Sequence, residues 1–115
     1  MFDQRMKIVK RPWGNFKQFV FNKKCTVKIH SVNAGQMLSL QKHKKRSEMW
    51  YFLTPGFVQL GKRKKKVKKG EILKIEKGKV HRLIAGKNKV EILEISFGKF
   101  SEKDEVRLED KYGRI

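Results

Sequence analysis

The sequence predicts an all-β fold, because three features of the chain agree. Over most of the 115 residues the apolar positions recur at period two, which is typical of half-buried strands. Turn signals, most of them glycines, return about every ten residues. No segment carries the apolar stripe of a helix. Many short strands at this spacing favour a sandwich or a barrel, with the jelly roll among the candidates.

The expected strands follow one another between these turns. At residues 27–30, Val and Ile alternate with Lys and His, and in a later strand Glu94 and Ser96 separate apolar neighbours. In alternating strands we expect the apolar set to face the core. The continuous apolar runs Met49–Leu53 and Ile72–Ile75 have strand length and are further strands.

One helical turn is expected near the C-terminus. Ser101-Glu-Lys-Asp104 has the pattern of a capping box, in which the serine hydroxyl and the acidic side chain three residues on accept each other's backbone amides. This turn would lead into residues 106–114. The chain shows no linker and no repeat, so residues 1–115 are predicted to form a single domain.

The charge of the chain is strongly positive. Lys and Arg number 30 against 11 Asp and Glu, a formal net charge of +19, which points to polyanions or small phosphorylated metabolites as partners. Lysine outnumbers arginine, and the dense basic run at 62–69 contains no aromatic residue for base stacking. We therefore expect no specific nucleic-acid binding and interpret the run as a solvated hairpin rim with a lysine-protected edge strand.

Other protein classes are excluded by simpler counts. The single cysteine, Cys25, cannot form an internal disulfide, and no Cys/His array has zinc-finger spacing. No apolar run approaches the roughly 18–20 residues that span a bilayer, and residues 1–14 lack the apolar centre of a signal peptide. We expect a cytoplasmic protein with no membrane partner.

Four residues could hold a metal ion. Gln41 and His43 are two apart, so they project from the same face of an extended strand, and Glu48 opens the next apolar strand. His81 follows the glycine turn at Gly78. Two imidazoles, a carboxylate and an amide oxygen suit one divalent Zn, Mn, Fe or Co ion, and the absence of thiolate argues against a closed structural zinc.

These residues also carry a resemblance to a known family. Gly35…Gln41-Lys-His43…Glu48 and Gly70…Gly78…His81 resemble the two motifs of the cupin superfamily, whose members are double-stranded β-helix (jelly-roll) barrels with a metal at the mouth. Between residues 11 and 114 the chain further resembles the C-terminal isomerase domain of type II mannose-6-phosphate isomerases. The resemblance to this isomerase domain rests on the motifs Arg11-Pro-Trp-Gly14, Leu38-Ser-Leu-Gln41, Arg46-Ser-Glu48, His81-Arg-Leu83 and the closing segment from Val106 to Arg114.

The resemblance implies a function and assigns its residues. The implied reaction interconverts mannose 6-phosphate and fructose 6-phosphate through a cis-enediolate, with one divalent metal ion as cofactor and a phosphorylated sugar as substrate. The implied metal ligands are Gln41, His43, Glu48 and His81; the substrate-binding residues are Lys28, Arg46 and Arg107; the candidates for catalysis are Glu109, Asp110, Tyr112 and Arg114. His30 and Arg82 receive no role, and we expect each to be structural or exposed.

Two alternatives stay open at this point. The chain could be a non-catalytic cupin that binds a sugar or sugar phosphate, as a partner of a separate nucleotidyltransferase, because no residue argument secures the catalytic base and the fold alone does not decide the function. It could also be a basic nucleic-acid-binding barrel, which the missing aromatics disfavour. Proteins of this family are often dimers, so a homodimer is one expected state.

Overall fold

The computed structural model describes residues 6–99 and 101–114. Its elements, in chain order, are β1 (Lys7–Arg11), β2 (Gly14–Gln18), β3 (Thr26–Val32), β4 (Leu40–His43), β5 (Arg46–Phe52), β6 (Gly56–Leu60), β7 (Arg63–Val67), β8 (Ile72–Ile75), β9 (His81–Ile84), β10 (Val90–Gly98), the 3-10 turn η1 (Glu102–Asp104) and β11 (Glu105–Glu109). The described residues contain no α-helix, so the predicted all-β class is confirmed. Among them, no helix has the length and apolar character needed to cross a membrane.

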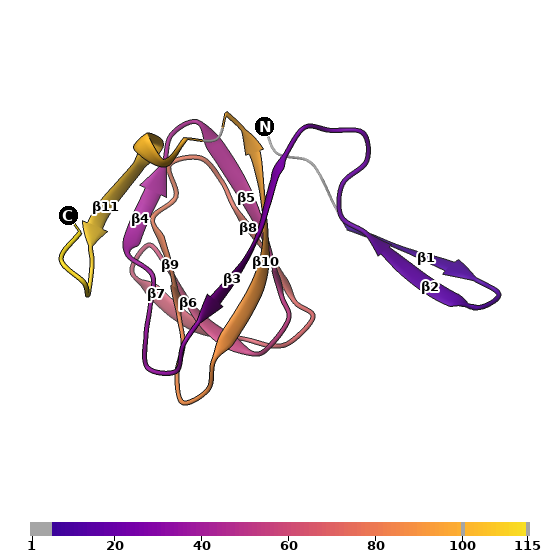
Figure 1. Cartoon of the computed structure of the whole chain (residues 1–115), viewed down its shortest axis with the longest axis horizontal. Coiled ribbons are helices and arrows are strands. Elements are labelled where there is room, and N and C mark those ends of the chain that lie inside the picture. The colour runs from indigo at the N-terminus through magenta and orange to yellow at the C-terminus, as the bar shows by residue number, and fades with distance from the viewer. Residues whose placement is uncertain (1–5, 100, 115) are drawn as a thin grey trace.

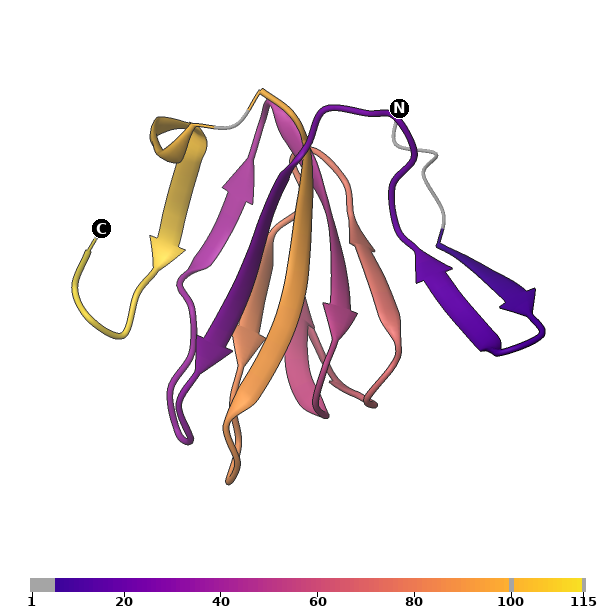
Figure 2. The ribbon, with the colours of Figure 1, turned by 45° about the vertical axis from the view of Figure 1, so that its right-hand side comes forward.

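Two antiparallel sheets face each other and form the barrel (Figure 1). One sheet has the order β3-β10-β5-β8 and the other β11-β4-β9-β6-β7. From β3 to β11 each strand lies in the sheet opposite its predecessor, except that β6 and β7 form a hairpin within one sheet. Figure 2 shows the barrel from another side. The hairpin of β1 and β2 projects away from the barrel, beside the sheet that holds β3 and β5. Because both sheets are twisted and packed face to face, the arrangement is a jelly roll.

The interior has an apolar half and a polar half. Trp50, Phe52, Val58, Leu83 and Ile92 are buried in the apolar half. The change is visible along the inward face of β10, where Val90 and Ile92 are followed by Glu94 and Ser96, all of them buried. The polar half is therefore enclosed by the same strands as the core, and it is where the functional side chains gather.

The predicted orientation of the apolar residues in β3 is wrong. Val27 and Ile29 are 55% and 60% exposed, whereas Lys28 and His30 face the interior. The same correction applies to Glu94 and Ser96 of β10, which are buried. The expectation fails because it assumes an apolar interior, and these positions line the polar half of the barrel.

The turns and the basic run agree with the sequence. Most glycines at the expected turns, although not Gly56 and Gly86, adopt positive φ. Gly98 also allows close approach, since a Cβ there would lie 2.5 Å from the backbone oxygen of Lys45. The lysine-rich residues 62–66 form the exposed turn and strand of the β6–β7 hairpin, and β7 lies at the edge of its sheet. The interpretation as a solvated hairpin rim is confirmed.

The predicted helical turn exists as η1, but its capping differs. The Ser101 hydroxyl accepts the Lys103 amide at 3.2 Å and not the expected Asp104 amide, which donates to the backbone oxygen of Ser101 at 3.1 Å. The Asp104 carboxylate instead accepts the backbone amides of Lys44 and Lys45, at 3.1 and 2.8 Å. Asp104 thus links η1 to the β4–β5 turn through the backbone amides of Lys44 and Lys45.

Candidate metal centre

Three strands bring the predicted metal ligands together. β4 carries Gln41 and His43 on one face, and Gln41 is the register partner of His81 on β9. Glu48 comes from β5, across the barrel interior. The ligand atoms of His43, Glu48 and His81 all lie within 4.8 Å of one another, and all three side chains are buried.

The distances leave room for an ion between the three side chains. Nε2 of His43 lies 3.5 Å from Oε2 of Glu48, and Nε2 of His81 lies 3.5 Å from Oε1 of the same carboxylate. Oε1 of Gln41, Nδ1 of His43 and Nε2 of His81 are buried and have no hydrogen-bond partner among the described residues. Unsatisfied buried atoms are costly, and nitrogen and oxygen donors beside a carboxylate suit a divalent ion. The residues present therefore fit the expected metal.

Neighbouring groups fix the orientation of two ligands. The Nδ1–H of His81 donates to the backbone oxygen of Lys79 at 2.8 Å, which leaves the lone pair of Nε2 directed at the site. The indole N–H of Trp50 donates to Oε1 of Glu48 at 3.2 Å. Nε of Arg46 donates to Oε2 of Glu48 at 3.1 Å. The carboxylate is held from both sides, which preorganises it for an ion.

Arg46 is buried and occupied with these contacts. Besides Glu48, its NH1 donates to the backbone oxygen of Ser101 at 3.0 Å, and its NH2 lies 3.4 Å from Nε2 of His43. The expected role of Arg46 was to bind a phosphate. In the structure its donors are directed at the carboxylate ligand and at the chain, so it positions Glu48.

The charge states also suit metal binding. Burial lowers the pKa of His43 to about 4, although the Glu48 carboxylate opposes this shift. Burial alone would raise the pKa of Glu48, but His81, His43 and Arg46 together hold it at about 2. His43 is therefore neutral and Glu48 ionised at neutral pH, which are the forms that coordinate a metal.

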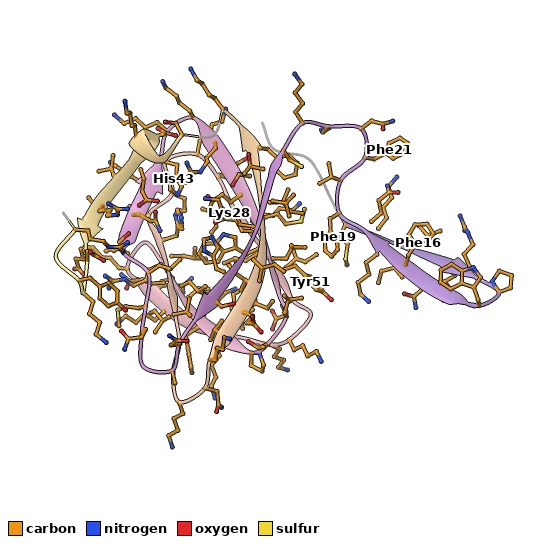
Figure 3. The ribbon with its side chains drawn as sticks, in the orientation of Figure 1. Phe16, Phe19, Phe21, Lys28, His43 and Tyr51 are labelled. Atoms are coloured by element: carbon orange, nitrogen blue, oxygen red, sulfur yellow. The ribbon has the colours of Figure 1, made fainter. Side chains whose placement is uncertain are left out.

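A cavity of about 250 Å³ opens next to this cluster. Its lining residues are Lys28, His30, Leu38, Ser39, Gln41, His43, Arg46, Glu48, Glu94, Glu105, Arg107 and Arg114. Figure 3 shows Lys28 and His43 within the ring of strands. Four basic residues and three of the four predicted metal ligands thus line one space.

Arg107, a predicted substrate-binding residue, and Arg114, a predicted catalytic residue, are each paired with a carboxylate. Nε of Arg107 forms an ion pair with Oε2 of Glu105 at 2.8 Å, although its N–H is not aimed at that oxygen. Arg114 binds the Asp110 carboxylate through Nε and NH2, at 2.8 and 2.9 Å. Both side chains are partly exposed, Arg107 at 32% and Arg114 at 49%.

Three of the predicted catalytic residues lie off the cavity. Glu109 is 66% exposed and bound by Arg82 at 3.2 Å, and Asp110 is held by Arg114, which lowers the pKa of the carboxyl. Tyr112 donates to Oε1 of Gln36 at a separate surface hollow. Of the four candidates for catalysis, the structure brings only Arg114 to the metal centre.

Sequence reasoning missed His30, Glu94 and Glu105 as lining residues. His30, expected to be structural or exposed, lies at the cavity, where its Nε2 is 3.0 Å from Oε2 of Glu94. Burial lowers the pKa of His30, but the bond to Glu94 outweighs it and the net shift is upward. A histidine and a glutamate at inward positions of neighbouring strands are the signal that could have revealed this pair. Arg82, as expected, has a structural role, since it binds Glu109 and the backbone oxygen of Leu38.

Known proteins of similar sequence decide the family. The profile of the "Mannose-6-phosphate isomerase C-terminal" family matches residues 2–110. The chain belongs to this family. Among curated proteins, it is 36% identical over 110 residues to the alginate biosynthesis protein AlgA of Pseudomonas aeruginosa, covering 92% of this chain and 23% of AlgA. It is 33% identical over 110 residues to the mannose-1-phosphate guanylyltransferase ManC of Salmonella typhimurium, covering 93% of this chain and 23% of ManC. The chain thus spans about a quarter of these relatives.

Solved structures show the same fold in other proteins. The capsular polysaccharide assembling protein CapF from Staphylococcus aureus matches with a TM-score of 0.66 and 16% identity, over 92% of this chain and 35% of CapF. A cupin protein from Bacteroides fragilis matches with a TM-score of 0.60 and 20% identity, over 70% of this chain and 74% of that one. The jelly-roll fold expected of this mannose-6-phosphate isomerase C-terminal family member is confirmed.

Proposed function

We propose that this protein is a divalent-metal-dependent aldose-ketose isomerase that interconverts mannose 6-phosphate and fructose 6-phosphate. One observation carries the proposal: a single cavity is lined both by the candidate metal ligands and by Lys28, Arg107 and Arg114. The family membership supports the choice of substrate. A sugar phosphate needs both features, since its phosphate requires cations and its reacting oxygens require an electrophile.

The roles follow from the contacts of each residue. Gln41, His43, Glu48 and His81 would hold the ion, and Arg46 keeps Glu48 oriented toward it. When bound, a divalent ion supplies electrophilic polarisation of the sugar oxygens during enolisation. The arginines at the cavity rim would bind the phosphate, whose remote binding energy orients the reacting carbons.

The proposal is tested by loading the purified chain with Zn, Mn, Co or Fe and measuring fructose 6-phosphate formation from mannose 6-phosphate in a coupled assay. We expect turnover that depends on the added metal. The control is His81→Ala, which loses a buried ligand and should lose both metal and turnover. Absence of turnover with every metal would contradict the proposal.

A second candidate function is favoured by the placement of the C-terminal residues. Because Glu109, Asp110 and Tyr112 lie off the cavity, none of them is in place to move a proton. If no other lining group acts as the base, the cavity would bind a sugar phosphate without converting it, in the manner of a binding subunit for a separate nucleotidyltransferase. Saturable binding of mannose 6-phosphate by calorimetry, without turnover, would favour this candidate.

A further inference from the structure

The cavity contains one imidazole that is not part of the metal cluster. His30 lies on β3 and faces inward, because the alternation of that strand turns Val27 and Ile29 outward. Its side chain is 27% exposed, whereas Glu94, to which it is bonded, is 7% exposed. The pair therefore consists of a buried carboxylate and an imidazole that reaches the space in which a ligand would lie.

The carboxylate of this pair is fixed relative to the metal cluster. The indole N–H of Trp50 lies 3.1 Å from Oε1 of Glu94 and 3.2 Å from Oε1 of Glu48. One donor thus connects the candidate ligand with the carboxylate behind His30. Since Glu94 uses its other oxygen for Nε2 of His30, the imidazole has a defined orientation and Nδ1 as its second nitrogen.

The remaining lining groups are less suited to accept a proton. Guanidinium and ammonium groups carry no free lone pair, and His43 and Glu48 belong to the metal cluster. The carboxylate of Glu105 is the strongest rival, but Arg107 pairs with it at 2.8 Å and Arg46 lies 4.0 Å away. Two cations beside a carboxylate weaken it as a base.

We propose that His30, oriented by Glu94, is the general base that transfers the proton between C2 and C1 of the sugar phosphate. This inference rests on the proposed function and supplies the base that the C-terminal residues do not provide. An imidazole backed by a buried carboxylate is a common arrangement for proton transfer, because the carboxylate fixes the tautomer and stabilises the imidazolium.

The proton balance closes within the pair. Nδ1 of His30 takes the proton from C2, and the electrons of that C–H bond form the C1–C2 double bond as the aldehyde oxygen becomes an oxyanion. The resulting imidazolium is stabilised by Glu94 through Nε2–H. The hydroxyl proton on O2 then moves to O1, the C2 carbonyl forms, and His30 returns its proton to C1. The base and the net charge are restored.

The test uses the metal-loaded full chain and the variants His30→Ala, His30→Gln and Glu105→Gln. Ile29→Ala, on the outer face of the same strand, is the matched control. Four quantities are measured: bound metal, KM, kcat, and the loss of deuterium from mannose 6-phosphate labelled at C2. Added imidazole tests whether a free base can replace the missing side chain.

For His30→Ala we expect kcat to fall by about 10²–10⁴-fold, with C2 deuterium wash-out falling in parallel. Bound metal and KM should stay near the wild-type values, and imidazole should restore at least part of kcat. Ile29→Ala should match the wild type. A merely structural role for His30 would not give rescue by imidazole, so rescue separates the two. If His30→Ala fails to fold, His30→Gln carries the same comparison.

Three outcomes would overturn the inference. The first is turnover by both His30 variants within about threefold of the wild type. The second is loss of metal on substitution of His30, and the third is loss of kcat in Glu105→Gln alone, which would assign the base to Glu105. An inactive wild type would instead overturn the proposed function, and the role of His30 would fall with it. The two failures are thus distinguishable.

Discussion

Replacement of Arg46 by alanine separates two roles for this side chain. A phosphate-binding arginine would affect KM, whereas an arginine that positions Glu48 would affect metal affinity and stability. In the structure Arg46 is buried and bound to Oε2 of Glu48 and to the backbone oxygen of Ser101. We therefore expect Arg46→Ala to destabilise the protein and to weaken metal binding.

The magnitude follows from what the substitution leaves behind. Removal of one partner of a buried ion pair costs about 3–5 kcal/mol, because the other charge stays buried. For a chain of 115 residues this corresponds to a fall in Tm of about 10–20 °C. Loss of a group that orients a metal ligand lowers metal affinity by about 10–100-fold. Added metal should recover part of the stability, since the ion compensates the charge of Glu48.

Thermal unfolding followed by circular dichroism, with and without metal, measures the first effect, and metal titration measures the second. Arg107→Ala is the matched control, because that arginine lies in the same cavity but is partly exposed and paired with Glu105. It should raise KM and leave Tm nearly unchanged. If Arg46→Ala keeps its Tm and its metal and raises only KM, the positioning role is wrong and Arg46 contacts the phosphate.

Four further predictions address other parts of the structure. His81→Ala should abolish metal binding, measured by elemental analysis, yet leave a folded protein with a stability loss of about 1–3 kcal/mol. Replacement of the three exposed lysines at 64–66 by serine should weaken retention on heparin but leave turnover intact, because charges beyond a Debye length of about 8 Å are screened. The pKa of His30 is raised above its ordinary 6.5 by Glu94, so the pair's stabilisation is fully present below pH 6.5 and is lost as the pH rises through the raised value. Urea unfolding of the wild type and His30→Gln should show the larger difference on the acid side. Gly98→Ala should cost about 1–3 kcal/mol, since φ is +106° and the new Cβ would meet the backbone oxygen of Lys45; an unchanged urea midpoint would contradict this.

The candidate metal cluster could be predicted because its geometry is local. Gln41 and His43 share a face through strand alternation alone, and Glu48 follows after one short turn. His81 is far away in sequence, and its position after the glycine turn at Gly78, together with the resemblance to the cupin motifs, predicts it as a ligand. The structure places it opposite Gln41, as the pairing of β4 and β9 requires.

The polar half of the barrel could not be predicted from periodicity. The alternation in β3 and β10 was recognised, but the rule that apolar residues face inward assigned the wrong face to Lys28, His30 and Glu94. His30 and Glu94 are stable there because they bond to each other and because the Trp50 indole donates to Glu94. These hydrogen bonds join strands that are far apart in the sequence, so the residue pattern of one strand does not predict them. The same reason explains why Arg46 was assigned to a phosphate and not to Glu48.

The attachment of the C-terminal segment to the β4–β5 turn has a consequence for the whole site. Asp104 accepts the amides of Lys44 and Lys45, Ser101 accepts Arg46, and β11 pairs with the strand that carries His43. Ordering of this segment and occupancy of the cluster are therefore linked equilibria, and the linkage is reciprocal. An ion that binds at His43 should slow amide hydrogen exchange in β11. A partner that binds and orders β11 should raise the affinity for the ion by the same factor by which the ion raises the affinity for the partner.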